Sequence, residues 1–125
     1  MDYTLFFRRL CASALDPSAD AEVASLFAGA GAFRDWAVGW RRRLAAEDTT
    51  AQVRASGMLR ANPALIPRNH RIEEVIAAAT LRDDFEPFET LVKALASPYE
   101  EQPEFAYLSQ PPGREERVQA TFCGT

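Results

Sequence analysis

The stretch from Asn62 to Arg71 constrains the fold of this 125-residue chain more than any other segment. It reads Asn-Pro-Ala-Leu-Ile-Pro-Arg-Asn-His-Arg and has periodic apolar segments on both sides. Proline fixes φ and lacks an N–H donor, so neither Pro63 nor Pro67 fits inside a regular helix. The residue before each proline is restricted to extended conformations. The stretch is therefore a connector of specified shape between two helical halves.

Apolar residues recur at spacings of three and four on both sides of this connector, which predicts amphipathic helices. The expected helices cover residues 3–15, 32–46, 51–61, 71–81 and 85–97, with a short helix from Ser18 or Asp20 to Phe27. The side chains expected to face the core from the longer helices are Phe33, Trp36, Trp40, Leu44, Ile72, Val75, Ile76, Ala79, Phe88, Leu91, Val92 and Leu95. The predicted fold is all-α, a bundle of about six helices.

Polar residues mark the expected helix starts. Thr49 or Thr50 is a good N-cap for the helix over 51–61, and Asn69 or His70 is expected to cap the helix over 71–81. The acidic pair at residues 83–84 is expected to cap the last helix. These assignments complete the prediction of where each helix begins.

The last 28 residues read differently from the rest. They contain four prolines, at positions 98, 103, 111 and 112, with aromatic residues between them. We expect an irregular tail that packs on the helices through these aromatic residues. The predicted organisation is a helical domain over residues 1–97 and a packed tail over 98–125.

Composition excludes several classes of protein. Hydrophobic residues make up 47% of the chain and charged residues 26%, which are globular values. A net charge of −4 argues against nucleic-acid binding, and no apolar run approaches the ~20 residues of a membrane span. No secretory signal pattern is visible, so a reduced, cytoplasmic compartment is expected.

Charge is unevenly distributed along the chain. Residues 34–71 hold eight arginines against three acids, and residues 83–104 hold seven acids against Lys93. The two segments could attract one another or face a charged partner. Solvated helix faces are the simpler interpretation and are favoured.

Few residues carry recognisable chemistry. Two cysteines and one histidine do not make a zinc site; Cys11 is expected to be buried, whereas Cys123 is expected to be exposed and open to redox chemistry. His70 as a general base would need a nucleophile and an orienting partner, so a capping or surface role is favoured. Trp36 and Trp40 could form a ligand platform, but core packing is favoured. No catalytic, cofactor-binding or metal residue is predicted.

Four segments share their order and spacing with a known set of motifs, and we call them the signature segments. They are Asp2–Leu10 (Asp-Tyr-Thr, then Phe-Arg-Arg-Leu), Trp40–Leu44 (Trp-Arg, then Arg-Leu), Met58–Asn69 (with Asn62, Pro63, Arg68 and Asn69) and the tail (Pro98-Tyr99, Glu101-Gln102-Pro103, Pro111-Pro112 and Cys123-Gly124-Thr125). Together they resemble the C-terminal part of the selenoprotein O (YdiU-like) family of kinase-like proteins.

The resemblance implies a protein adenylyltransferase. Family members have a kinase-like fold, bind ATP with Mg²⁺ or Mn²⁺ and transfer AMP to protein hydroxyls. Their catalytic lysine, glutamate and metal-binding acids match no position here. The resemblance therefore implies that this chain is about the last quarter of a longer protein, has a structural or regulatory role, and is predicted to be inactive alone. Its implied partner is the kinase-like catalytic domain of the same polypeptide.

The resemblance also assigns roles to individual residues. Cys123, third from the end, takes the place of the terminal cysteine or selenocysteine that the family links to redox control, with a disulfide partner outside this chain. Asn62 and Pro63 are expected to shape the turn, and Arg68 to bond carbonyls or a carboxylate across it. Asn69 is the fourth residue expected to have a structural role, as a cap of the next helix.

Three other interpretations stay open. The chain could be a stand-alone helical interaction module whose basic run, residues 41–43, docks an acidic partner. It could be a small redox protein that uses Cys123. A homodimer of the chain is a further hypothesis, because a part severed from its catalytic domain can expose an apolar patch.

Overall fold

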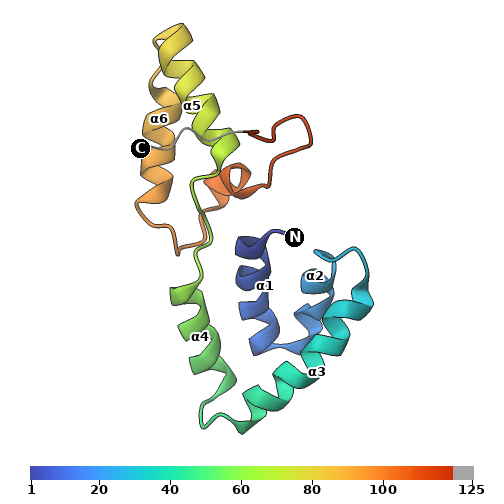
Figure 1. Cartoon of the computed structure of the whole chain (residues 1–125). Coiled ribbons are helices and arrows are strands. Elements are labelled where there is room, and N and C mark those ends of the chain that lie inside the picture. The colour runs from blue at the N-terminus through green and yellow to red at the C-terminus, as the bar shows by residue number, and fades with distance from the viewer. Residues whose placement is uncertain (120–125) are drawn as a thin grey trace, which may run out of the picture. The chain divides into compact units, whose positions relative to one another are not determined.

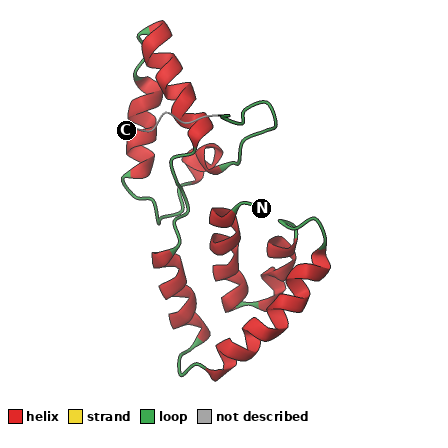
Figure 2. Ribbon diagram, in the orientation of Figure 1, coloured by secondary structure: helices red, strands yellow, loops and turns green. Residues whose placement is uncertain are grey.

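The computed structural model describes residues 1–119, and within that range it contains only helices and loops (Figure 1, Figure 2). The elements are α1 (Tyr3–Leu15), the 3₁₀ helix η1 (Pro17–Ala19), α2 (Asp20–Ala24), α3 (Ala30–Ala46), α4 (Ala51–Ala61), α5 (Asn69–Arg82), α6 (Glu86–Leu95) and the 3₁₀ helix η2 (Pro103–Ser109). The all-α prediction with six α-helices is confirmed.

Most predicted helix bounds agree closely with the structure. Helices α1 and α4 have the predicted bounds, and α3, α5 and α6 differ from them by at most two residues at either end. The expected short helix to Phe27 is instead split into η1 and α2, which ends at Ala24. The tail, expected to be irregular, contains one regular piece, η2.

The chain divides into two compact units, Met1–Pro63 and Ala64–Thr125, which we call the first and second units. The boundary falls inside the connector that the prolines specify. Each unit has its own cluster of buried apolar side chains. The predicted assignment of residues 1–97 to one helical domain, with a tail over 98–125, stays a prediction.

The first unit is built around the inner face of α1. Side chains from α1, α2 and α3 bury one another, while α4 packs along α1. The buried members of this cluster are Phe6, Leu10, Val23, Phe33 and Ala37. Burial of these apolar side chains provides the main driving force for folding of the unit.

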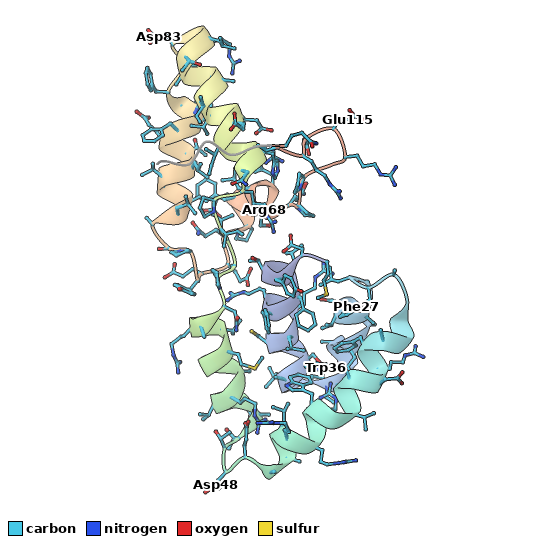
Figure 3. All side chains as sticks on the ribbon, in the orientation of Figure 1. Phe27, Trp36, Asp48, Arg68, Asp83 and Glu115 are labelled. Carbon is cyan, nitrogen blue, oxygen red and sulfur yellow. The ribbon has the colours of Figure 1, made fainter. Side chains whose placement is uncertain are left out.

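The prediction that Trp36 faces the core is wrong, because 46% of this residue is exposed. Phe33 and Ala37 fill the face of α3 that lies against the core, so Trp36 lies at the edge of that face (Figure 3). Its ring contacts Phe6 edge-on at 6.0 Å between centroids and stacks on Trp40 at 5.3 Å. The tryptophan pair is thus an aromatic border of the core rather than its centre.

The second unit forms around α5, α6 and the tail. Leu65 from the connector, Leu91 and Ala94 from α6, and Leu108 from η2 make its buried cluster. Phe105 of η2 packs against this cluster as well. Residues from the described tail therefore complete the core of this unit.

Three core assignments in the second unit are wrong. Ile76, Phe88 and Val92 were expected to face inward, but 48%, 51% and 53% of these residues are exposed. Helical periodicity identifies an apolar face without saying how much of it the rest of the chain can cover. In α6 that face is wider than the surface that meets the other elements of the unit.

Of the predicted N-caps, the one of α4 is confirmed and the one of α5 is wrong. The Thr50 hydroxyl accepts a hydrogen bond from the Val53 N–H at 3.2 Å, as an N-cap should. The predicted cap of α5 by Asn69 or His70 is wrong, since Arg68 is the N-cap and no side chain makes a capping bond. The backbone of Arg68 is extended and its carbonyl accepts a hydrogen bond from the N–H of Ile72. Helix α5 therefore begins at Asn69, before the predicted start at residue 71.

Asp83 and Asp84 were both expected to cap α6, but only Asp84 bonds to its first turn. Asp83 ends α5 in the left-handed conformation, with φ of 53°. Its neighbour Asp84 accepts a hydrogen bond from the N–H of Glu86 at 3.1 Å at the start of α6. Pro87 lies in the first turn of α6, where its missing N–H costs little.

Asp16, at the end of α1, shows how a cap changes titration. Its carboxylate accepts a hydrogen bond from the Ser18 N–H at 2.8 Å, which lowers the pKa of Asp16 below its usual value. A lowered folded-state pKa adds stability above the unfolded-state pKa. That contribution is lost as pH falls through the folded-state pKa.

Replacing Thr50 with alanine should lower the free energy of unfolding by about 1 kcal/mol, because the Val53 N–H loses its cap. Urea denaturation measures the change. Thr49→Ala is the matched control, since the side chain of Thr49 does not cap α4. Equal losses from both substitutions would contradict the assigned cap.

Candidate functional site: the signature segments and the cavity beside them

Within residues 1–119, no group of three or more histidine, cysteine, aspartate or glutamate side chains is placed to hold a metal ion. None of the helices in the same range is both long and apolar enough to cross a membrane. Candidate sites must therefore be sought where polar side chains converge on helix ends. The signature segments supply most of these side chains.

In the first unit, the first and third signature segments meet. Arg8 of α1 donates hydrogen bonds from Nη1 to the carbonyls of Leu59 and Asn62, at 3.1 and 2.8 Å. The Asn62 amide donates from Nδ2 to the carbonyl of Met58 at 2.8 Å. Carbonyls in the last turn of a helix lack intrahelical donors and carry partial negative charge. Arg8 and Asn62 donate hydrogen bonds to such carbonyls at the end of α4. Asn62 therefore has a structural role.

Arg9 and Arg41 make two similar connections in the first unit. The Arg9 guanidinium donates to the carbonyl of Glu22 at 3.0 Å, at the end of α2. Arg41 pairs with the carboxylate of Asp20 and donates to the hydroxyl of the buried Ser13 at 3.1 Å. The basic run at residues 41–43 is thus partly engaged in internal contacts, which weakens the case for a stand-alone acidic-partner site.

In the second unit, the third and fourth signature segments meet. The N–H groups of Ala64 and Leu65 both donate to the carbonyl of Pro98, at 2.8 and 3.1 Å. Gln102 donates from Nε2 to the carbonyls of Ala94 and Ser97, both at 2.9 Å. The tail therefore ties the connector to the end of α6.

A cavity of about 420 Å³ lies between the rest of the connector and the tail. It is lined by Ile66, Pro67, Arg68, Asn69, His70, Pro112, Glu116, Arg117 and Val118. Arg68, labelled in Figure 3, lies at the start of α5. The cavity thus brings Arg68 and Asn69 together with the part of the tail that leads to Cys123, which itself lies outside the described residues.

The lining of this cavity favours negative charge. It contains two arginines and one glutamate, and the amide end of α5 lies there without a side-chain cap. Free N–H groups in the first turn and the helix dipole both attract anions. The Glu116 carboxylate already accepts a hydrogen bond from the Gly113 N–H at 2.7 Å. The arrangement can hold an acidic group, and its side chains offer no assembled acid–base pair.

His70 is buried, so the expectation of a capping or surface role is wrong. Only 5% of this residue is exposed, and its Nε2 atom has no hydrogen-bond partner among residues 1–119. The neighbouring Arg71 binds Glu74 at 2.8 Å. No sequence pattern indicated this burial, and the cavity that His70 lines also involves tail residues more than 40 positions away.

The structure describes only one of the two cysteines. Cys11 is buried, as predicted, and its Sγ donates to the carbonyl of Phe7 at 3.2 Å. The redox role of Cys123 falls on a residue outside the described range and stays a prediction. The same holds for the predicted bond of Arg68 across the junction.

Comparison with known proteins identifies relatives of the whole chain. The family model described as "Protein adenylyltransferase SelO" matches residues 1–96. The chain is 55% identical over 124 residues to the "Protein nucleotidyltransferase YdiU" of Rhodopseudomonas palustris, 50% over 124 to that of Nitrobacter hamburgensis, and 51% over 130 to that of Methylorubrum extorquens. These alignments cover 99% of this chain and 25%, 24% and 26% of the relatives. The chain therefore spans about a quarter of the length of the curated relatives it matches.

Replacing Arg8 with alanine should lower the free energy of unfolding by about 2 kcal/mol, because two carbonyls at the end of α4 lose a charged donor. Thermal and urea denaturation measure the loss. Arg60→Ala is the matched control, since Arg60 is an exposed arginine in the same helix end. If Arg60→Ala lowers the free energy of unfolding as much as Arg8→Ala, the loss comes from the positive charge and not from the two hydrogen bonds.

Proposed function

The chain belongs to the SelO family of protein adenylyltransferases, and on that premise we propose that it is the C-terminal helical part of such an enzyme. The observation that carries the proposal is the unequal coverage: 99% of this chain aligns with 25% of a relative. A part of this size supports a larger catalytic body. Its order of signature segments, ending in the cysteine-containing tail, resembles the end of family members.

In the complete protein, a kinase-like catalytic domain would bind ATP with Mg²⁺ or Mn²⁺ and transfer AMP from the α-phosphate to a protein hydroxyl. Such transfer depends on positioning and electrostatic stabilisation of the phosphates. The described residues contain no acidic cluster suited to a metal ion. We therefore assign ATP and metal binding to the portion of the protein outside this chain.

The role of this chain would be to brace that catalytic domain and to carry a regulatory tail. Arginine and amide side chains fix helix ends within each unit, so each unit taken by itself presents a defined surface. Cys123 follows Val118 of the cavity lining by five residues. Oxidation of its thiol to a disulfide with the catalytic domain would link the tail to activity, with both thiols losing a proton and an electron to a cellular oxidant.

Incubated alone with labelled ATP, Mg²⁺ or Mn²⁺ and a generic protein substrate, the chain should transfer no AMP. We expect label only when the chain replaces the matching quarter of the Rhodopseudomonas palustris relative in a full-length chimera. Autoradiography of the separated proteins measures the transfer. Clear labelling by the chain alone would overturn the assignment of catalysis to the remainder of the protein.

A further inference from the structure

We propose that the outward face of α6, formed by Phe88 and Val92 together with the N-cap residue Phe85, docks onto the remaining three quarters of the full-length protein. This inference rests on the proposed function. It adds the particular surface through which the helical part would attach. The occupant is the portion of the relatives' length that this chain does not match.

The three residues form one continuous stripe. They are spaced by three and four positions, which places them within about 60° of one another around the helix axis. Their exposed fractions are 53%, 51% and 53%. Among residues 1–119, no other helix, taken together with its N-cap residue, places three exposed large apolar residues in so narrow an arc.

The other sides of α6 are already occupied. Leu91 and Ala94 are buried against Leu65 and Leu108. Lys93 lies over the ring of Phe105, 5.7 Å from its centroid. The stripe is therefore the side of α6 that stays about half exposed beside this buried face.

Single exposed apolar residues are normal on a monomer, whereas a contiguous apolar stripe marks an interaction surface. Glu89 lies between Phe88 and Val92 in the sequence and borders the stripe, with Glu86 one turn before it. Both acids are exposed. The complementary surface should therefore be an apolar groove with basic residues at its rim.

The alignments favour the missing portion of the protein over other occupants. Relatives about four times as long as this chain share 50–55% identity with it along nearly its whole length. A helical part of that kind must contact the rest of its polypeptide somewhere. Three exposed apolar side chains that lie side by side are a surface whose burial would stabilise that contact.

Site-specific labelling tests the surface. Val92→Cys and Phe88→Cys are made in the isolated chain and in the full-length chimera described above, and the rate of maleimide addition is measured on the peptide that carries each cysteine. We expect both rates to fall at least tenfold in the chimera. Val53→Cys is the matched control, because Val53 is a helical valine of similar exposure, 62%, in α4 of the first unit; its rate should be unchanged.

The outcomes separate this inference from the proposed function. An AMP-transferring chimera in which positions 88 and 92 react as fast as in the isolated chain would overturn the α6 surface and leave the proposed function standing. Equal protection at position 53 would also overturn it. A chimera that folds without AMP transfer would count against the proposed function itself. Slow labelling in an isolated chain that sediments as a dimer would assign the stripe to a second copy instead.

Discussion

The hydrogen bonds from Arg8 to the end of α4 hold together the helix arrangement that burial of the apolar cluster stabilises in the first unit. They join the first helix of the chain to the last helix of the unit, across more than 50 residues. A helix that ends inside a small domain leaves carbonyls without donors, and burying them unpaired is costly. An arginine offers several N–H groups in a planar fork and can satisfy two carbonyls at once. The position of α4 against α1 follows from that geometry.

The same solution recurs through the unit. Arg9 closes the end of α2, and Arg54 donates to the carbonyl of Leu44 at 2.7 Å at the end of α3 while it pairs with Glu47. Arg41 and Arg54, which belong to the basic middle of the sequence, are therefore structural. The second unit meets the same need with an amide, because Gln102 donates to the carbonyls of Ala94 and Ser97 at the end of α6. The bonded arginines, Asn62 and Gln102 all belong to the signature segments or to the helix ends beside them.

The sequence predicted helices well because their limits are set locally. Prolines, a threonine cap and spacings of three and four each act within a few residues, and α1 and α4 were predicted to the residue. Burial was predicted less well. Phe88 and Val92 belong to an apolar face, but whether that face is covered depends on elements elsewhere, or on another part of the protein. The periodicity of α6 contains no such information.

The cavity at the start of α5 could not be predicted for a related reason. It needs Pro112 and Arg117 beside Arg68 and His70, a contact between segments more than 40 residues apart in sequence. The family resemblance singled out Arg68 and Asn69 without indicating what they line. His70 lies outside the segment that carries the resemblance, and its burial was not predicted.

The boundary between the two units also bears on the order in which the protein assembles. All the hydrogen bonds from Arg8, Arg9 and Arg41 described above end within residues 1–63. The first unit can therefore complete its contacts while the ribosome is still adding the second. The second unit cannot, because Leu65 near its beginning is buried against Leu108 near its end. Until Leu108 has been synthesised, the apolar side chains of the connector and of α6 stay exposed to water. The second unit is therefore the part of a nascent chain that would most need a chaperone.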